Sequence, residues 1–294
     1  MKRYYLGIDG GGTKTSYAVI DDDKNILYRS VGGPSSIDTL PLESVKKTIL
    51  EETSKIPYKV SFVYAGIGGI VSQDGIDKVN NILKDIKCLE NKDNVDSGND
   101  VNNALFGALD GKDGIILISG TGSVAFGKHN NKYHRTGGYS YKEGDAGSAY
   151  DLGFKALQHL ARVLDKREKN SQFAEKLKET INCYDYQSLA NFFNEANRTQ
   201  IASLAKIVTQ FENDKYAKKI IINSANEAAN LVNTTYRVLR FNTKTPLSII
   251  GSLGNAKTLY RDILLSKLNK NIEVIDAIYN PTIGACLKSK SLYK

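Results

Sequence analysis

The chain has 294 residues, of which 41% are hydrophobic and 24% are charged, and its formal net charge is +8. This length is sufficient for two ordinary domains, and the composition is that of a globular protein. No apolar stretch approaches the roughly 20 residues that a membrane-spanning helix needs. The N-terminus also lacks the pattern of a secretory signal, so we expect a cytoplasmic protein without a membrane partner.

The cysteines and the basic residues each argue against a class of site. Cys88, Cys183 and Cys286 are widely spaced and form no Cys-x-x-Cys pair, which disfavours a disulfide framework, an iron–sulfur centre or a zinc site. Lysine and arginine are spread along the chain without the aromatic-interleaved basic cluster of a nucleic-acid-binding module. We therefore expect no nucleic-acid partner.

The opening stretch carries the first indication of chemistry. An apolar segment, Tyr4 to Ile8, predicts a strand that leads through Asp9 into three glycines and a Thr-Lys-Thr sequence, after which Ser16 to Ile20 predicts a second strand. Glycines permit a tight turn whose N–H groups can contact phosphate, and threonine and lysine add further donors. Asp9 is placed to hold hydrated Mg²⁺. The residues expected to contact a nucleotide here are Asp9, Gly11, Gly12, Thr13, Lys14 and Thr15.

Two better-known phosphate-binding loops do not fit this stretch. A Walker A loop needs a Gly-Lys-Ser/Thr sequence followed by a helix, whereas Gly12 is followed by Thr13 and then by a predicted strand. The Rossmann fingerprint fails because Thr15 stands in the place of its third glycine. A phosphate-binding β-hairpin and an ordinary glycine-rich hairpin turn remain as interpretations.

The next segments alternate between strands and helices. Asp21-Asp22-Asp23 predicts a hairpin tip, because its spacing is not that of a calcium-binding loop. The predicted elements are a strand over Asn25–Val31, a helix from Pro41 to about Ser54, a strand over Val60–Ile67, a helix from about Asp74 to Lys87, a short strand near Asp93–Asp96 and a helix over Val101–Leu109.

At Gly114 the opening pattern starts again. A strand over Ile115–Ser119, a Gly/Thr turn over 120–123 and a strand over Val124–Gly127 indicate a weak internal duplication. The later predicted elements are a helical region from Ser148 to about Leu239 with breaks near Lys169 and Asn197, a strand over Leu247–Ile250, a helix to about Leu268, a strand over Ile272–Ile275 and a closing helix from Pro281.

Five motifs occur in the order in which the sugar kinase/Hsp70/actin superfamily carries them. They are Asp9–Thr15, Asn99-Asp100, Gly120–Ser123, Gly137-Gly138 with Gly144-Asp145, and Gly251–Asn255. Over essentially its whole length the chain resembles the N-acetylglucosamine kinase and BadF/BadG ATPase family, and within it the bacterial N-acetylmuramate/N-acetylglucosamine kinases. The resemblance implies an α/β fold of two RNase H-like (actin-like ATPase) domains that flank a nucleotide/sugar cleft. We expect residues 1–110 with the closing helix 281–294 to form one domain, and residues 111–280, with a helical insertion, to form the other.

The same resemblance implies an ATP- and Mg²⁺-dependent kinase that phosphorylates the 6-hydroxyl of an N-acetylated amino sugar, acts as a homodimer and serves cell-wall recycling. The phosphates would contact the first turn and Gly120, Thr121, Gly122 and Ser123, and the adenosine would contact Gly251, Ser252, Gly254 and Asn255. Asp9 would order the metal, and Asp100 matches the catalytic base. The implied sugar-binding residues are Ser35, Ser36, Asn99, Asp100, Thr121, Gly137, Gly138 and Asp145. The structural alternatives are a helix N-cap for Asp100 and a simple turn residue for Asp145.

One loop departs from the family pattern. Relatives that bind N-acetylglucosamine commonly carry Asn after the third strand, where this chain has Ser35-Ser36. Small hydroxyl side chains leave room and can donate to an anionic or ether oxygen. We therefore expect N-acetylglucosamine and N-acetylmuramic acid to be phosphorylated, and glucosamine to be a poorer substrate.

Other functions remain as alternatives. A glucosamine kinase would share the motifs. A BadF-type dehydratase activator would need a cluster-ligating cysteine in a glycine-rich setting, and a zinc-bearing glucokinase would need a Cys-rich motif; neither surrounds Cys88, Cys183 or Cys286. A nucleotide-dependent scaffold without an acceptor would leave Asp145 unexplained.

Overall fold

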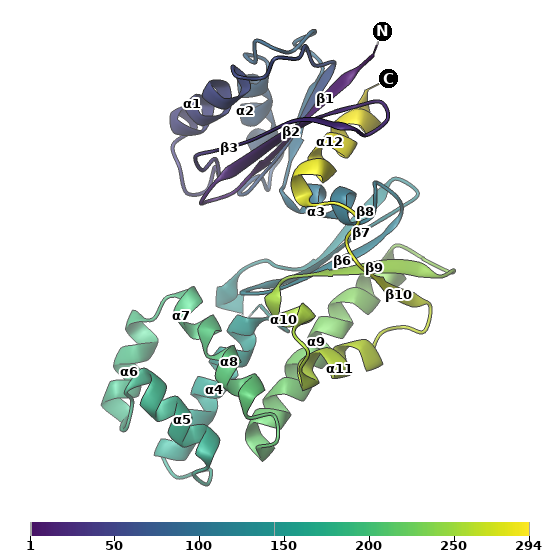
Figure 1. Cartoon of the computed structure of the whole chain (residues 1–294). Coiled ribbons are helices and arrows are strands. Elements are labelled where there is room, and N and C mark those ends of the chain that lie inside the picture. The colour runs from purple at the N-terminus through teal and green to yellow at the C-terminus, as the bar shows by residue number, and fades with distance from the viewer. Residues whose placement is uncertain (1, 144, 294) are drawn as a thin grey trace. The chain divides into compact units, whose positions relative to one another are not determined.

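The computed structural model describes residues 2–143 and 145–293, and the chain folds as two compact units. The first comprises residues 1–113 and 276–294, and the second comprises residues 114–275. The predicted domain boundaries fall a few residues from these divisions. Each unit is built on a five-stranded sheet flanked by helices (Figure 1). Within the described residues, every helix is too short or too polar to cross a bilayer.

The sheet of the first unit has the strand order β3-β2-β1-β4-β5. Its strands are β1 (Tyr4–Gly10), β2 (Thr15–Asp21), β3 (Ile26–Gly32), β4 (Phe62–Ile67) and β5 (Val95–Gly98). The first three strands are antiparallel, whereas β4 runs parallel to both β1 and β5. Asp21 lies at the predicted hairpin tip between β2 and β3, where its Oδ1 accepts the N–H groups of Asp23 at 3.0 Å and Asn25 at 2.9 Å.

Helices cover both faces of this sheet (Figure 1). They are α1 (Leu42–Thr53) and α2 (Gln73–Leu83) on one face, and α3 (Val101–Ala108) and α12 (Pro281–Leu292) on the other. Leu6 and Ile8 of β1 belong to the core formed with α1 and α2, while Tyr5 belongs to the core formed with α3 and α12. Because both faces are covered, the strand is apolar throughout instead of alternating with polar residues.

The predicted closing helix is confirmed as α12, and it packs very closely in the first unit. A Cβ atom added at Gly7 of β1 would lie 2.3 Å from the backbone nitrogen of Cys286. A Cβ atom added at Gly284 would lie 1.9 Å from the carbonyl oxygen of Asn103 in α3. These contacts require glycine, because no larger residue leaves room for the neighbouring backbone.

The second unit repeats the sheet topology of the first. Its strands are β6 (Gly114–Ser119), β7 (Ser123–His129), β8 (Lys132–Gly137), β9 (Thr245–Ile250) and β10 (Ile272–Ile275), in the order β10-β9-β6-β7-β8. The predicted duplication of strand, turn and strand is therefore confirmed, and it extends to the whole sheet. β8 was not predicted, because this edge strand is polar and partly exposed and so lacks an apolar run.

The long helical region predicted after residue 148 is also confirmed. It consists of α4 (Ala149–Leu164), α5 (Gln172–Ile181), α6 (Tyr186–Glu195), α7 (Arg198–Ser203), α8 (Ala205–Gln210) and α9 (Lys215–Val238). The predicted breaks coincide with N-cap side chains that accept helix N–H groups, Ser171 before α5 and Asn197 before α7. The helix predicted to end near Leu268 is instead two helices, α10 (Ser252–Asn255) and α11 (Leu259–Ser266), because Ala256 and Thr258 have extended backbone conformations.

Candidate functional site

The first glycine-rich turn connects β1 to β2, as predicted. The N–H group of Gly11 donates to the carbonyl oxygen of Lys14 at 3.0 Å and closes the turn. Gly12, Thr13 and Lys14 are exposed at its tip. The turn therefore presents small residues, a hydroxyl group and an ammonium group to solvent, which is the chemistry that a phosphate chain requires.

Three residues that were predicted to contact ligands instead support this turn from inside. The Thr15 hydroxyl lies 2.7 Å from the Ser35 hydroxyl, and both side chains are 0% exposed. Ser36 is also buried and donates to the carboxylate of Asp38. The backbone N–H groups of Ser35 and Ser36 donate to the carbonyl oxygen of Gly11 at 3.0 and 3.3 Å. These side chains therefore hold the turn and the loop after β3 in place, and the contacts of Thr15 with nucleotide and of Ser35 and Ser36 with sugar stay predictions.

Asp9 lies at the end of β1 and is held by a residue that the sequence did not single out. The side-chain amide of Asn103 donates to Asp9 Oδ1 at 2.7 Å and also lies 3.1 Å from the carbonyl oxygen of Gly66. Asn103 is fully buried, and a Cβ atom at Gly66 would lie 2.1 Å from its Oδ1. Gly66 thus makes room for an amide that fixes the orientation of the carboxylate.

The electrostatic surroundings of Asp9 suit a cation. Burial raises the pKa of the Asp9 carboxyl, and the nearby charge of Asp100 raises that pKa further, while the Asn103 hydrogen bond and Lys14 act in the opposite direction. Two carboxylates that disfavour each other's charge would both be stabilised by a divalent cation. Because Mg²⁺ prefers one or two carboxylates and keeps several waters, the Asp9 carboxylate fits Mg²⁺.

Asp100 immediately precedes α3. Its side chain does not cap the helix, which was the structural alternative to a catalytic role. Its side chain makes no capping hydrogen bond, and it is exposed. Asn99 acts locally instead, because its Oδ1 accepts the N–H of Val101 at 3.2 Å and its Nδ2 donates to the carbonyl oxygen of Ile70 at 3.1 Å. The structure therefore gives Asn99 a positioning role, whereas Asp100 is an exposed residue without a capping role.

The strand register brings these residues to one edge of the first sheet. Gly10 pairs with Ile67 and Gly66 pairs with Gly98, so β1, β4 and β5 end side by side. The glycine-rich turn follows β1, and Asn99-Asp100 follows β5. Ligands of open α/β sheets bind at the carboxyl ends of parallel strands, which is where the fold places Asp9 and Asp100.

The second turn, Gly120–Ser123, occupies the equivalent place between β6 and β7. The carbonyl oxygens of Gly120 and Thr121 accept the N–H groups of Ala149 at 2.9 Å and Tyr150 at 3.2 Å, at the start of α4. The Thr121 side chain is exposed. The Ser123 hydroxyl is buried, 2.6 Å from the carbonyl oxygen of Ala146. This hydroxyl therefore secures the neighbouring loop, and the contact of Ser123 with the phosphates stays a prediction.

Asp145 lies in that loop and forms an ion pair that the sequence did not predict. Its backbone has a φ of 41°, and its carboxylate pairs with the guanidinium of Arg198 at the start of α7. Arg198 is 53 positions away in a helical region of many charged residues, so no sequence signal distinguishes it. Gly144 of the predicted motif lies outside the described residues.

The remaining predicted residues lie in two further turns of the second unit. Gly137 and Gly138 have φ values of 77° and 70°, and the Arg135 side chain donates to the carbonyl oxygens of both. A Cβ atom at Gly251 would lie 2.4 Å from the carbonyl oxygen of Ser119, so this turn adjoins the end of β6. The Asn255 amide donates to the carbonyl oxygen of Ile249 at 2.9 Å.

These last residues differ in what they present to solvent. Ser252 is exposed and Gly251 partly so, whereas Gly254 is buried. Ile118 pairs with Ile250, so β6 and β9 end together and the turns that follow them lie at one edge of the second sheet. That edge corresponds to the one that carries Asp9 and Asp100 in the first unit.

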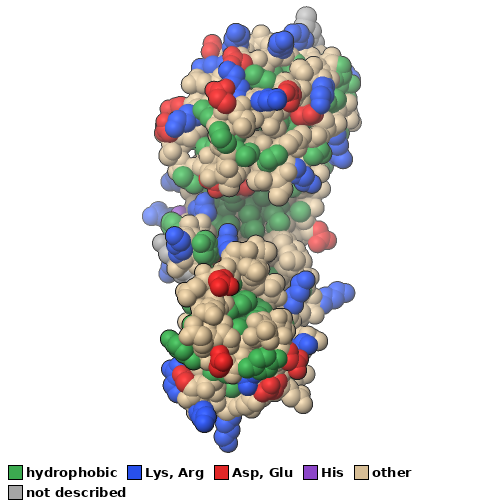
Figure 2. Space-filling view, turned by 90° about the vertical axis from the view of Figure 1, so that its left-hand side faces the viewer, with side chains coloured by type: hydrophobic (Ala, Val, Ile, Leu, Met, Phe, Trp, Pro, Cys, Tyr) green, Lys and Arg blue, Asp and Glu red, His purple; other side chains and the backbone are tan. Residues whose placement is uncertain are grey.

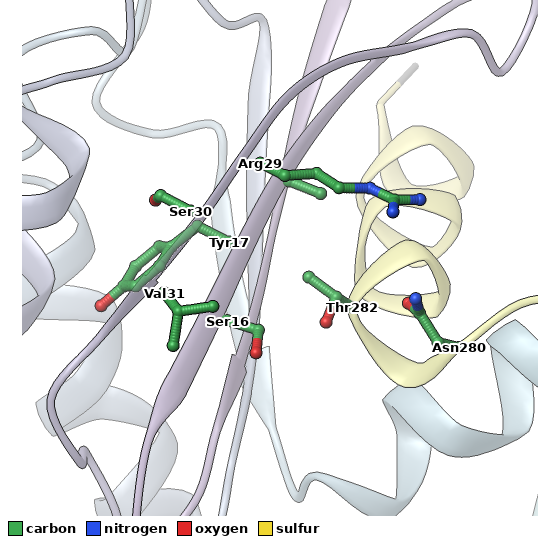
Figure 3. A pocket seen from close by; sticks show the side chains of 8 residues that line it. Ser16, Tyr17, Arg29, Ser30, Val31, Asn280 and Thr282 are labelled. Atoms are coloured by element: carbon green, nitrogen blue, oxygen red, sulfur yellow. The ribbon is translucent and has the colours of Figure 1, made fainter.

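Two pockets are lined by none of the predicted site residues. One, of about 280 Å³, is bounded by β2, β3 and the start of α12; Arg29 points toward α12 in Figure 3, whereas Tyr17 points away from it. The other, of about 390 Å³, includes Lys155, His159 and Lys219 of α4 and α9. On the face shown in Figure 2, basic side chains are interspersed with acidic ones instead of forming a single patch. The site assignment therefore rests on the turns and carboxylates.

Comparison with known proteins gives consistent matches. The model of the BadF/BadG/BcrA/BcrD ATPase family matches residues 6–289. The chain is 28% identical to the N-acetylmuramic acid/N-acetylglucosamine kinase of Clostridium acetobutylicum, over 98% of this chain and 99% of that protein. It is 25% identical to the N-acetyl-D-glucosamine kinase of Dictyostelium discoideum, over 97% of each protein.

Solved structures show the same fold. A candidate N-acetylglucosamine kinase from Chromobacterium violaceum matches with a TM-score of 0.71 at 21% identity, over 98% of this chain and 99% of that chain. Together with the two repeated five-stranded sheets, this match confirms the predicted fold class.

Proposed function

Because the chain belongs to the BadF/BadG/BcrA/BcrD ATPase family, we propose that it is an ATP-dependent kinase for the 6-hydroxyl of an N-acetylated amino sugar. The proposed acceptors are N-acetylglucosamine and N-acetylmuramic acid, the sugars in the names of its relatives from C. acetobutylicum and D. discoideum. The observation that carries the proposal is the shared sheet edge at which Asp9, the first turn and Asp100 lie together.

In the first unit, the exposed turn would bind the β- and γ-phosphates through Gly12, Thr13 and Lys14. Asp9, oriented by Asn103, would hold Mg²⁺. When bound, the ion neutralises charge on the phosphoryl group that is transferred. The buried Thr15–Ser35 pair would keep the turn in one conformation, which lowers the entropy lost when a phosphate chain binds.

Asp100 would serve as the catalytic base. Phosphoryl transfer passes through a loose transition state, so the base mainly orients the acceptor hydroxyl and takes its proton late. The structure supports this role in two ways: the carboxylate is exposed at the sheet edge, and Asn99 already makes the capping hydrogen bond of α3.

In the second unit, we assign Gly120, Thr121 and Gly122 to the phosphates and Gly251, Ser252 and Gly254 to the adenosine. Asn255 and Ser123 would act indirectly, because their side chains bind the backbone of neighbouring segments. Gly137, Gly138 and Asp145 would contact the sugar. Carboxylates accept hydrogen bonds from paired sugar hydroxyls, which is the role proposed for Asp145.

The cysteines argue against the activator alternative. Cys88, Cys183 and Cys286 are all buried, and burial raises the pKa of each thiol, that of Cys286 to about 12. Cluster ligation requires accessible thiolates, and these thiols are neither accessible nor easily ionised.

The test is a coupled ADP-release assay with purified protein and Mg²⁺. N-acetylglucosamine and N-acetylmuramic acid should give turnover, glucosamine should be poorer, and the sugar-free reaction should be slow. EDTA should abolish turnover, and ³¹P–¹H correlation spectra of the product should place the phosphate on C6. Equal ADP release with and without every sugar would contradict a sugar kinase, whereas a glucosamine preference would contradict only the acceptor assignment.

The family resemblance also supports a cytoplasmic homodimer that serves the recycling of cell-wall amino sugars. Light scattering after size-exclusion chromatography tests the dimer directly. Fractionation of the producing cells tests the compartment.

A further inference from the structure

Arg198 is an unexpected cation beside a residue assigned to the sugar. Its guanidinium pairs with the carboxylate of Asp145. The Asp145 side chain is 2% exposed, whereas that of Arg198 is 41% exposed. One end of the guanidinium is thus engaged by a buried acid, while the rest of the group is partly open to solvent.

The guanidinium has unused hydrogen-bonding capacity. Among the described residues, the Nε atom of Arg198 is buried and has no hydrogen-bond partner. A guanidinium carries five N–H donors in a planar arrangement that matches a carboxylate. A buried donor that is left unpaired costs free energy, so an acceptor that reached this part of the guanidinium would be bound favourably.

The position of Arg198 is fixed from several sides. Its guanidinium carbon lies 5.8 Å from the centre of the Tyr141 ring. A Cβ atom on Gly122 would lie 2.1 Å from Arg198 Nη2, so the guanidinium lies against the second Gly/Thr turn. The start of α7 is held by a capping box between Asn197 and Gln200. The cation is therefore held in place before any ligand binds.

The charges at this position favour an acidic sugar. Alone, the buried Asp145 carboxylate would bind the hydroxyls of a neutral sugar and repel an anionic one. Paired with Arg198, it can still accept sugar hydroxyls, and the guanidinium offers a counter-charge to an anionic substituent nearby. N-acetylmuramic acid differs from N-acetylglucosamine by one such substituent, a lactyl carboxylate on O3.

A phosphate of ATP fits these observations less well. Asp145 offsets part of the charge of Arg198, whereas a polyphosphate carries several negative charges and would benefit more from an unpaired cation. A single planar carboxylate matches the remaining guanidinium edge. The buried Ser35 and Ser36 leave the loop after β3 without the open hydroxyls that were expected to accommodate the lactyl group.

We propose that Arg198 is the specificity-determining residue for the acidic amino sugar, binding the lactyl carboxylate of N-acetylmuramic acid while Asp145 accepts the ring hydroxyls. This inference rests on the proposed kinase function. In this proposal, Arg198 makes no contact that N-acetylglucosamine needs. Activity on N-acetylglucosamine therefore tests the kinase function, and activity on N-acetylmuramic acid tests the role of Arg198.

The test compares kcat/KM for both sugars in the wild type and in Arg198→Met. Loss of a charge-assisted bidentate contact should lower kcat/KM for N-acetylmuramic acid by about ten- to a hundredfold, mainly through KM. The value for N-acetylglucosamine should change by less than about threefold. Arg198→Lys keeps the charge without the planar guanidinium. Its kcat/KM for N-acetylmuramic acid should therefore lie between those of the wild type and Arg198→Met. Arg167→Met is the matched control, because it removes an equal charge from an exposed pair with Asp165.

A second measurement uses the methyl ester of N-acetylmuramic acid and does not depend on how a variant folds. The wild type should prefer the free acid to the neutral ester, and Arg198→Met should lose this preference. A merely structural role for Arg198 would leave the acid-to-ester ratio unchanged.

Several outcomes would overturn the proposal. An equal fall in kcat for both sugars would assign Arg198 to the phosphoryl group. An equal rise in KM for both sugars would reduce it to a support for Asp145. Turnover of N-acetylglucosamine alone by the wild type would refute the inference and leave the kinase function standing, whereas no turnover of any amino sugar would refute the function itself.

Discussion

Asp9 shows how one buried amide can prepare a carboxylate for a metal ion. Asn103 approaches Asp9 Oδ1 from inside the first unit and thereby restricts the rotation of the carboxylate. The remaining carboxylate oxygen is available for a cation whose charge offsets the proximity of Asp100. A hydrogen bond to a side chain that binds a metal ion tunes both the geometry and the affinity of the metal site.

Replacing Asn103 should therefore weaken metal use. In Asn103→Ala, the Mg²⁺ concentration for half-maximal activity should rise about tenfold or more, the range found for residues that orient metal ligands. Loss of the buried amide should also cost about 1–3 kcal/mol of stability, because the acceptors that it served remain buried. Magnesium titration of activity and urea unfolding measure the two effects. Asn91→Ala, at an exposed position of the same unit, is the control, and an equal shift in both variants would contradict the role of Asn103.

The proposed role of Asp100 as the catalytic base leads to a separate prediction. Asp100→Asn should fold normally and bind sugar with nearly unchanged affinity, because the carboxylate is exposed and the α3 capping hydrogen bond comes from Asn99. Its kcat should fall by about 10²–10⁴-fold, the usual contribution of a general base. Calorimetry and steady-state kinetics test both parts. A variant that keeps more than about a tenth of the wild-type kcat would exclude Asp100 as the base.

Among single residues, the sequence identified glycines that the backbone geometry requires, such as Gly137 and Gly251. It also identified the charged residues within the same motifs. It could not distinguish Thr13, which is exposed, from Thr15, which is buried, because both belong to one motif. The sequence did not identify Asn103 and Arg198, because their roles arise from tertiary contacts with residues 94 and 53 positions away. Neither contact has a local sequence pattern.

Among the elements, α12 depends on glycine at its contacts with β1 and α3. In Gly284→Ala, the added methyl group would collide with the backbone of Asn103 and Gly107, neither of which can turn aside. Overpacking of this kind typically costs about 1–3 kcal/mol, and sometimes more. Urea unfolding should show this loss, whereas Ser291→Ala on the exposed side of α12 should be near neutral. Equal stability of the two variants would refute the close packing described here.

The β2–β3 hairpin should make stability depend on acid pH. Hydrogen bonds from the Asn25 side chain and from backbone N–H groups hold the pKa of Asp21 below its usual value. The ionised form is thus favoured in the folded state, so this contribution is present above about pH 4 and is lost as the pH falls through the lower, folded-state pKa. Asp21→Asn should lower Tm at pH 7, and the difference from the wild type should narrow as the pH falls below about 4. Asp93→Asn, at an exposed position, is the matched control variant.

The helices and strands could be predicted from the sequence where a single physical feature determines them. Apolar runs covered on both faces predicted β1 and β4, and N-cap residues coincided with the breaks before α5 and α7. The polar edge strand β8 and the break between α10 and α11 were missed, because their conformations depend on neighbouring strands and turns more than on local periodicity.

For the whole molecule, the proposed reaction requires ATP and sugar to bind together. The family resemblance implies that Thr121 contacts both ligands, so binding of one should favour binding of the other. We expect a non-hydrolysable ATP analogue to lower the Kd of N-acetylglucosamine by about fivefold or more, within the usual range of coupling between sites. Calorimetric titration of the sugar with and without the analogue measures this change. Independent binding would contradict a common site.

The return of the chain into the first unit has a consequence for synthesis. Tyr5, Ile20 and Phe106 share an apolar core with Ile283 and Leu287 of α12. On the ribosome, residues 114–275 can emerge and fold while that core still lacks its last helix. The unit that is translated first is therefore completed last, and its uncovered apolar face must be protected from aggregation until translation reaches the end of α12.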